Sequence, residues 1–290
     1  MRTTAKWGGP GDMIAADRRN RVGLVIRPEE FTDVRYEIED AGYAVLTIDR
    51  PQRMNSFTGR TVDELISAFK HAWVDKRVAA VVLTGAGDRA FCTGGDVKLR
   101  AQTGGYGETE WGSFEVERLH RIIREIPKPV IAAVNGAAVG GGHVLHVLCD
   151  LSIAAEHARF GQTGPKVGSF DAGFGSAYLA RVVGEKRARQ IWFLLDLYDA
   201  ATAERWGLVN EVVPADQLMT KAGEYATKIA SYSPTALKFL KHSFNADTDH
   251  MSGIGALAFD GLDLFTETAE SKEGAAAFAE KRPPDFTPYR

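Results

Sequence analysis

The sequence has little of what marks several classes of protein. It has only two cysteines in 290 residues, and no Cys/His cluster has the spacing of a zinc site. No apolar run approaches the roughly 18 residues of a membrane-spanning helix, and the N-terminus lacks a secretory apolar segment. A formal net charge of −3 gives no electrostatic reason for a nucleic-acid or membrane partner. We therefore expect a cytoplasmic protein with neither partner and no metal site.

The two cysteines, Cys92 and Cys149, are far apart in the sequence, and each lies inside an apolar run. Free cysteine is among the most buried residue types, and disulfides are rare in reducing compartments. We expect two buried thiols rather than a disulfide.

Composition divides the chain into three regions. Residues 1–30 mix glycine, proline and a basic patch, and we expect an N-terminal arm outside the main fold. Residues 31–215 alternate apolar β-rich runs with segments of helical periodicity. Residues 216–290 are mostly helical, with Pro234 opening one helix and Pro283–Pro284 ending the last.

Alternating strands and helices predict an α/β fold with a parallel sheet. The expected strands cover residues 34–38, 44–48, 79–83, 130–134 and 151–155. We expect three helices here. The first is capped by Thr61 and continues to about Trp73, and the other two cover residues 114–126 and 142–149. The segment 40–42 ends in glycine and should join the first two strands as a hairpin.

Three glycine-rich segments each follow an apolar run, at residues 93–96, 140–142 and 161–175. The last has five glycines and one proline in fifteen residues, so its backbone should approach something closely. It also carries Ser169 and Asp171. We expect a pocket walled by backbone N–H groups, with one carboxylate and one hydroxyl as its chemical side chains.

Gly95 and Gly141 lie where an expected strand gives way to a helix, and an N–H there has no intrahelical partner. Two such donors converging on one oxygen would form an oxyanion hole. From spacing alone, these glycines could equally serve only tight packing. Asp171 could likewise be a turn-former that binds its own backbone. Ser169 has no Gly-x-Ser-x-Gly motif, and His143 and His146 fit helix positions, so we expect no Ser-His-Asp triad.

Residues 31–286 resemble the crotonase, or enoyl-CoA hydratase/isomerase, superfamily. The motifs that carry the resemblance are Asp49–Phe57, Ala90–Asp96, Pro127–Ile131, Val139–Gly142 and Cys149–Leu151. The resemblance implies a spiral of ββα units over residues 31–215. It implies that the helical region 216–290 serves trimerisation and completes the active site, in a homotrimer or a dimer of trimers.

Further segments resemble one branch, that of 1,4-dihydroxy-2-naphthoyl-CoA synthase and 2-ketocyclohexanecarboxyl-CoA hydrolase. They are residues 140–146, 161–175, 189–193, 233–237 and 280–286. The resemblance implies that Gly95 and Gly141 hold the thioester oxygen of an acyl-CoA. It gives Ser169 and Asp171 hydrogen bonding and proton transfer at the attacked carbonyl, and Tyr106 the role of closing over the substrate.

The resemblance implies no tightly bound cofactor, because coenzyme A arrives with the substrate. The candidate contacts to coenzyme A are Arg53, Lys98, Arg100 and Lys281. For Lys98 and Arg100, a solvated basic face explains the sequence equally well.

Simple hydratases of this superfamily use two glutamates to position and protonate water. At the matching positions this chain has Val144 and Gly164, and neither can transfer a proton. In synthases with glycine at the second position, a bicarbonate ion fills the gap as a base. The resemblance implies that residues Gln162, Thr163 and Trp192 would hold it around Gly164.

One departure from the branch is Thr266, where a tyrosine commonly donates to the substrate. The resemblance still implies an enzyme that makes or breaks a ring carbon–carbon bond beside a thioester enolate, most like the synthase. A ring-opening hydrolase is the alternative that Thr266 favours. An enoyl-CoA hydratase/isomerase is a further alternative. A non-catalytic scaffold would predict the loss of Gly141 or Asp171, and both are present.

Overall fold

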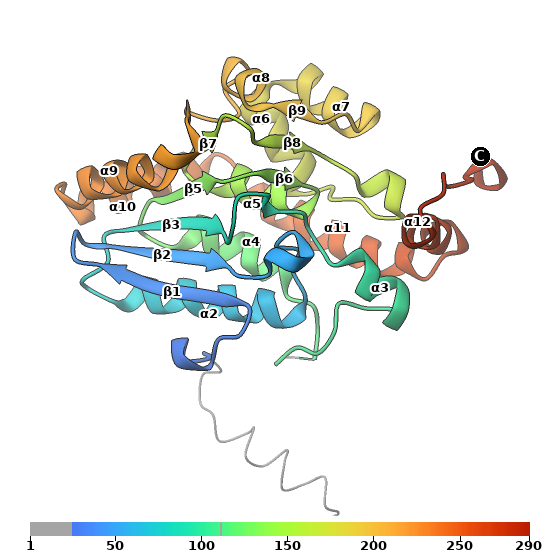
Figure 1. Cartoon of the computed structure of the whole chain (residues 1–290), viewed down its shortest axis with the longest axis horizontal. Coiled ribbons are helices and arrows are strands. Elements are labelled where there is room, and N and C mark those ends of the chain that lie inside the picture. Colours follow the sequence, from blue (N-terminus) through green and yellow to red (C-terminus); the bar gives the residue numbers. More distant parts are fainter. Residues whose placement is uncertain (1–24, 111) are drawn as a thin grey trace, which may run out of the picture.

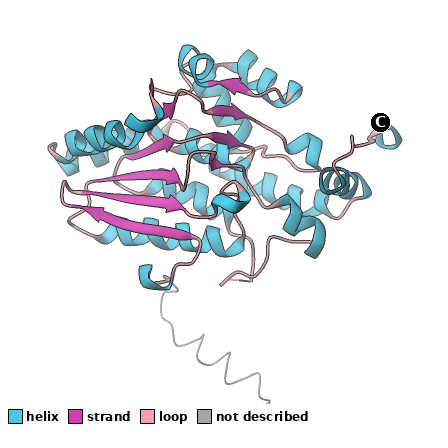
Figure 2. Ribbon diagram, in the orientation of Figure 1, coloured by secondary structure: helices cyan, strands magenta, loops and turns pink. Residues whose placement is uncertain are grey.

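A six-stranded sheet forms the centre of the computed structural model, which describes residues 25–110 and 112–290 (Figures 1 and 2). Its strand order is β1-β2-β3-β5-β7-β10. Only the β1–β2 hairpin is antiparallel, and the remaining neighbours are parallel. The strands are β1 (Val34–Glu39), β2 (Tyr43–Ile48), β3 (Ala80–Gly85), β5 (Val130–Val134), β7 (Leu151–Ala155) and β10 (Glu211–Val213). The predicted α/β fold and its five predicted strands are confirmed.

A second sheet of very short strands lies beside the first. Its order is β4 (Ala90–Cys92), β6 (Ala137–Val139), β8 (Arg159–Gly161) and β9 (Tyr198–Asp199). The first three are mutually parallel, and β9 is antiparallel to β8. The sequence did not predict this sheet, because two or three residues are too few to show a strand's alternation.

Helices cover the sheets on both sides (Figure 2). They are α2 (Gly59–Val74), α3 (Val97–Thr103), α4 (Val116–Glu125), α5 (Gly141–Leu148), α6 (Leu179–Val183), α7 (Glu185–Leu194), α8 (Ala200–Arg205), α9 (Leu218–Ala230), α10 (Pro234–Ala246), α11 (His250–Thr266) and α12 (Ala269–Glu280). The predicted cap at Thr61 is wrong by three residues. Thr58 is the N-cap, and the backbone N–H of Thr58 donates to Thr61 Oγ1 at 3.1 Å, which completes a capping box.

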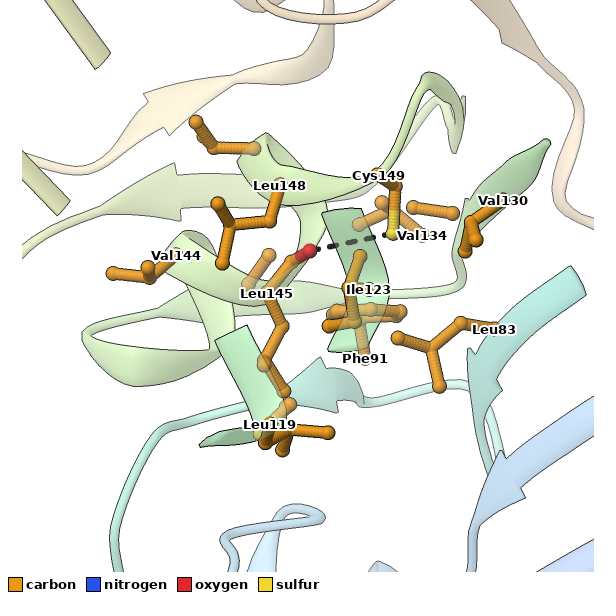
Figure 3. Close-up of a cluster of buried hydrophobic side chains, with 14 of the residues drawn as sticks. Leu83, Phe91, Leu119, Ile123, Val130, Val134, Val144, Leu145, Leu148 and Cys149 are labelled. Atoms are coloured by element: carbon orange, nitrogen blue, oxygen red, sulfur yellow. Dashed lines mark hydrogen bonds between the residues drawn. The ribbon is translucent and has the colours of Figure 1, made fainter. Parts of the chain in front are cut away.

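The strands of the main sheet bury both faces, as their continuous apolar runs predict. In β3, Val81 and Leu83 join the larger core with α2, α4 and α5, whereas Ala80 and Val82 pack towards α9. Figure 3 shows part of the larger core, with Leu145 and Leu148 of α5 beside Cys149.

Both cysteines are free and buried, which confirms the prediction of two thiols. The Cys149 thiol donates to the carbonyl oxygen of Leu145 at 3.3 Å (Figure 3). Burial raises the pKa of the Cys92 thiol to about 12, so it stays protonated at neutral pH.

The predicted C-terminal boundary of the N-terminal arm, residue 30, lies too far along the chain. Residues 1–24 lie outside the described residues, but Ile26 is buried against α2. Its N–H donates to Ser67 Oγ at 3.1 Å, and its carbonyl oxygen lies 2.9 Å from His71 Nε2. Residues 25–30 therefore belong to the fold.

Within the described ranges, no helix is both long and apolar enough to cross a membrane.

The N-terminal end of α2 fixes the segment that carries Tyr106. The N–H of Gly59 donates to the carbonyl oxygen of Tyr106 at 2.7 Å, and the N–H of Glu110 donates to Asp63 Oδ2 at 2.6 Å. Arg60 also pairs with Glu110 at 3.2 Å. Since Asp63 is almost fully buried and its Oδ1 has no partner in the part of the chain that the structure describes, its ionisation is unfavourable.

Replacing Asp63 with asparagine should stabilise the protein above neutral pH. Burial raises the pKa of Asp63 to about 6 from 3.8, and the Glu110 and Glu115 carboxylates add to the rise. A raised carboxyl pKa gives stability that is present below pH 3.8 and is lost as the pH rises through 6. We expect Asp63→Asn to gain up to about 3 kcal/mol in the free energy of unfolding at pH 8.

The gain should vanish near pH 4, because the wild-type carboxyl is then protonated and uncharged, like the asparagine amide. The asparagine oxygen still accepts the N–H of Glu110. Urea unfolding at both pH values measures it, with Asp88→Asn at an exposed position as the control. Equal stability of Asp63→Asn and wild type at pH 8 would contradict the argument.

Candidate active site

The three glycine segments meet at one edge of the second sheet. Strands β4, β6 and β8 are parallel neighbours, so their carboxyl ends lie side by side. Residues 93–96, 140–142 and 161–164 directly follow these ends. The short sheet therefore brings together three segments that are far apart in the sequence.

A cavity of about 280 Å³ opens at this edge, and α4, α7 and α11 complete its wall. The predicted site residues that line it are Gly95, Arg100, Tyr106, Gly141, Gln162, Thr163, Gly164, Ser169, Asp171, Trp192 and Thr266. Three predicted coenzyme A contacts, Arg53, Lys98 and Lys281, are exposed and lie outside this lining, where their role stays a prediction.

The backbone around Gly95 leaves its N–H free. Phe57 donates its N–H to the carbonyl oxygen of Gly94 at 2.8 Å and accepts from the N–H of Asp96 at 3.0 Å. This parallel bridge uses the groups on either side of Gly95. No backbone acceptor takes the Gly95 N–H among residues 25–110 and 112–290.

Gly141 supplies the second donor, as the first residue of α5, where the N–H has no intrahelical acceptor. The two segments touch, since a Cβ added to Gly94 would lie 2.7 Å from the Gly141 nitrogen. A Cβ on Gly141 would come within 2.6 Å of Phe57 Cζ, and one on Gly95 within 2.4 Å of Tyr106 Cε1. Tight packing and an oxyanion hole, which the sequence left as alternatives, are thus compatible at both glycines.

Buried polar side chains hold the segment that contains Gly95. Arg50 pairs with Asp96 at 3.5 Å and with Asp33 at 3.4 Å. Asn55 is fully buried, and its Nδ2 donates to the carbonyl oxygens of Ala86 at 2.9 Å and Ala90 at 2.7 Å. Arg50 and Asn55 belong to the motif 49–57, so this motif anchors the residue after β3, the first residue of β4 and the N-cap of α3.

Tyr106 lies against Gly95. Its ring stacks on Phe114 with centroids 4.4 Å apart, and its edge contacts Gly95. This position agrees with a side chain that closes over a substrate at the Gly95 N–H.

Asp171 forms a local turn with one of its two carboxylate oxygens. Its Oδ1 accepts from the N–H groups of Gly173 at 3.2 Å and Gly175 at 2.9 Å. In the described chain no donor reaches Oδ2. The turn-forming and proton-transfer interpretations are therefore compatible, because the two oxygens divide the tasks.

Arg100 supports the loop that carries Ser169. Its Nη2 donates to the carbonyl oxygens of Val167 at 2.6 Å and Gly168 at 3.3 Å, and the residue is 8% exposed. The alternative of a solvated basic face is therefore wrong for Arg100, although it fits the exposed Lys98. From the other side, Ser271 Oγ of α12 donates to the same Gly168 oxygen at 2.6 Å.

On the side where a Cβ would point, Gly164 has backbone rather than the expected gap. A Cβ there would lie 2.8 Å from the carbonyl oxygen of Ser169. Two of the proposed ligands also have other partners: Trp192 Nε1 donates to the Gly175 oxygen at 2.6 Å, and Gln162 Nε2 lies 3.3 Å from His143 Nδ1. In this arrangement the residues do not fit a bicarbonate ion, and we derive no step through one.

Thr266 uses its hydroxyl within its own helix. Its Oγ1 donates to the carbonyl oxygen of Asp263 at 2.8 Å, so it does not replace the phenol that the branch commonly places there.

Sequence reasoning missed His120, which lies on α4 and lines the cavity. A signal was available, because position 120 falls at helical spacing from Val116 and Ile123 on the buried face of α4. A polar residue on an apolar helix face requires either an internal partner or a ligand.

The comparisons with known proteins identify the family of the chain. A family model described as enoyl-CoA hydratase/isomerase matches residues 39–288. A structure of an enoyl-CoA hydratase from Mycobacterium avium subsp. paratuberculosis K-10 is 31% identical, with a TM-score of 0.77 over 88% of this chain and 99% of that one.

A carnitinyl-CoA dehydratase from Mycobacterium avium 104 gives the same values for identity, TM-score and coverage: 31%, 0.77, 88% and 99%. A monofunctional enoyl CoA isomerase from M. smegmatis is 33% identical over 75% of this chain and 94% of that one, with a TM-score of 0.65. The chain belongs to the enoyl-CoA hydratase/isomerase family, the crotonase superfamily of acyl-CoA enzymes.

Proposed function

We propose that this acyl-CoA enzyme makes or breaks a ring carbon–carbon bond beside the thioester. The observation that carries the proposal is the set of groups in the cavity: two free N–H donors and Asp171, without the hydratase glutamates. At the first glutamate position, Val144 is buried in the apolar core (Figure 3). At the second, Gly164 packs against backbone.

The two other carboxylates of the cavity lining are less suited to proton transfer. Glu117 forms an ion pair with Arg121 on the same helix, and Asp263 is exposed on α11. Asp171 lies instead in the glycine loop beside Ser169. We infer that Asp171 is the acid–base group of the site.

The proposed chemistry follows from where charge develops. When the carbon next to a thioester carries a negative charge, the thioester oxygen shares that charge as an enolate. The N–H groups of Gly95 and Gly141 would stabilise this oxygen more strongly than the neutral carbonyl, which lowers the barrier. Asp171 Oδ2 would accept or return the proton.

The site supports two directions of this chemistry. The branch-specific segments favour ring closure, an intramolecular Claisen condensation of o-succinylbenzoyl-CoA to 1,4-dihydroxy-2-naphthoyl-CoA. Thr266 favours ring opening of a 2-ketocyclohexanecarboxyl-CoA-like substrate. Its hydroxyl donates to the carbonyl oxygen of Asp263, so it does not replace the tyrosine phenol that commonly donates to the substrate in the synthase. In that reaction, water adds to the ring ketone and the thioester enolate is expelled.

A homotrimer or a dimer of trimers is part of the proposal. Four large apolar side chains on α10 and α11 are between 69% and 78% exposed: Phe239, Phe244, Leu257 and Leu264. Large apolar side chains that stay exposed on a helix are typical of subunit interfaces.

Incubation of the pure protein with two CoA thioesters, one for ring closure and one for ring opening, tests the proposal directly. We expect turnover of o-succinylbenzoyl-CoA or of 2-ketocyclohexanecarboxyl-CoA, identified by the mass of the product. Ring opening adds the mass of one water, whereas ring closure releases one. Rapid hydration of crotonyl-CoA with neither ring reaction would overturn the proposal and restore the hydratase alternative.

Asp171→Asn should lower kcat by about 10²–10³-fold, because the amide cannot accept the substrate proton. The amide oxygen can still accept the N–H groups of Gly173 and Gly175, so the melting temperature and the affinity for coenzyme A should change little. Steady-state kinetics with calorimetric titration of coenzyme A separates these effects. A variant that keeps more than about half of the wild-type kcat would remove Asp171 from proton transfer.

Turnover should not depend on bicarbonate, since the ligands expected to hold it have other partners and backbone fills the space beside Gly164. We expect equal rates in carbon-dioxide-stripped buffer with and without added bicarbonate, at constant pH and ionic strength. Sodium nitrate at the same concentration controls for a general anion effect. A rate that falls on stripping and recovers only with bicarbonate would restore the ion as the base.

A further inference from the structure

His120 is a buried histidine with no partner on either ring nitrogen. It is 1% exposed, and neither Nδ1 nor Nε2 has a hydrogen bond within the described ranges. The fully buried His143 and His146 differ, because each has a partner on Nδ1: Gln162 for His143 and Ser152 for His146, both at 3.3 Å. His120 also differs from them in lining the cavity.

The surroundings of His120 are apolar. Its ring lies edge-on to Phe174, with centroids 6.4 Å apart, and 5.7 Å from the ring of Phe259 on α11. Neither phenylalanine can accept or donate a conventional hydrogen bond. Burying two polar atoms without partners costs free energy, and native proteins rarely do so without a compensating ligand or water.

The imidazole is expected to be neutral. Burial lowers the pKa of His120, while the carboxylates of Asp171 and Glu117 oppose that shift. A neutral imidazole carries one N–H donor and one acceptor nitrogen. It therefore suits an uncharged carbonyl group better than a carboxylate or a phosphate.

The ring-opening substrate, which has a ketone beside the thioester, has a second oxygen that needs such a donor. Gly95 and Gly141 account for the thioester oxygen, but attack on the second carbonyl group places negative charge on its oxygen as well. Thr266 does not supply a donor there, since its hydroxyl binds Asp263. His120 lines the same cavity as Asp171, whose carboxylate partly offsets the lowering of the His120 pKa by burial.

We propose that His120 is a catalytic residue whose ring N–H binds the second carbonyl oxygen of the acyl group, the one whose carbon is attacked. This inference rests on the proposed function, which it deepens by defining the substrate class as acyl-CoA thioesters with a carbonyl group beyond the thioester.

The ring-opening step shows the electron balance. The oxygen of water forms a bond to the ketone carbon, the π pair moves to the ketone oxygen beside His120, and Asp171 takes a proton from the water. The oxygen then re-forms its double bond, and the electron pair of the ring carbon–carbon bond moves onto the thioester enolate at Gly95 and Gly141. Asp171 returns the proton to the enolate carbon. His120 donates a hydrogen bond throughout and loses no proton.

Binding of two short thioesters, measured in the Asp171→Asn background so that neither is turned over, tests His120. Acetoacetyl-CoA has a second carbonyl group, and butyryl-CoA has the same chain without it. We expect His120→Phe to weaken acetoacetyl-CoA binding about 10-fold in calorimetry and to leave butyryl-CoA binding unchanged. His120→Gln keeps an N–H donor and should retain part of the preference. His146→Phe removes a buried histidine outside the cavity and serves as the matched control.

Kinetics and stability supply further readouts. His120→Phe should lower kcat about 10²–10³-fold on the ring substrate, the loss typical of one oxyanion donor. Its melting temperature should not fall, because the change removes two buried polar atoms without partners. If neither ring thioester is turned over, the proposed function fails, but the ratio of the two binding constants still decides the role of His120. An unchanged ratio in both His120 variants would overturn the inference.

Discussion

The candidate active site depends on the parallel pairing of three very short strands. Strands β4, β6 and β8 place their carboxyl ends together, and each end runs directly into a glycine segment. Beyond these strand ends, Gly141 opens α5, so its N–H has no intrahelical acceptor. The bridge to Phe57 leaves the N–H of Gly95 without a backbone acceptor in the described chain. Two backbone donors are thereby fixed by the fold itself rather than by mobile side chains. Fixed donors need no reorganisation when charge appears on a substrate oxygen.

Buried polar contacts keep this edge rigid from several directions. Asn55 binds two carbonyl oxygens beside β4, and Arg100 binds two in the loop that leads to Ser169. At the amino ends of β5 and β7 in the main sheet, Lys241 of α10 donates to Asp150 Oδ2 at 2.6 Å and to the carbonyl oxygens of Ile123 and Lys128. Burial lowers the pKa of Lys241, and the adjacent Asp150 carboxylate opposes this shift. Such groups are costly to bury singly, so their mutual satisfaction specifies one arrangement of the loops.

The sequence predicted the main sheet well, because each long apolar run carries its own signal. It also identified the glycine segments, Asp171 and Tyr106 as neighbours in one cavity, through motifs rather than periodicity. It did not predict the second sheet, whose strands are held by pairing and not by local propensity. The gap expected at Gly164 failed for a related reason: the Ser169 backbone that fills it is positioned by the Arg100 and Ser271 contacts. Tertiary contacts of this kind have no pattern along the chain.

The polar groups around the cavity fall into two sets, those with a protein partner and those without one in the described chain. Asn55 and Arg100 lie close to the cavity and have protein partners for the groups that matter. The N–H groups of Gly95 and Gly141 and the ring of His120 have none in the described chain. A folded chain of this size could satisfy these groups with small changes, such as a serine hydroxyl near His120 in place of a phenylalanine. Their shared lack of a partner, within one cavity, is what a site shaped for a ligand with two oxygens requires, since each donor gains its partner only when the substrate binds.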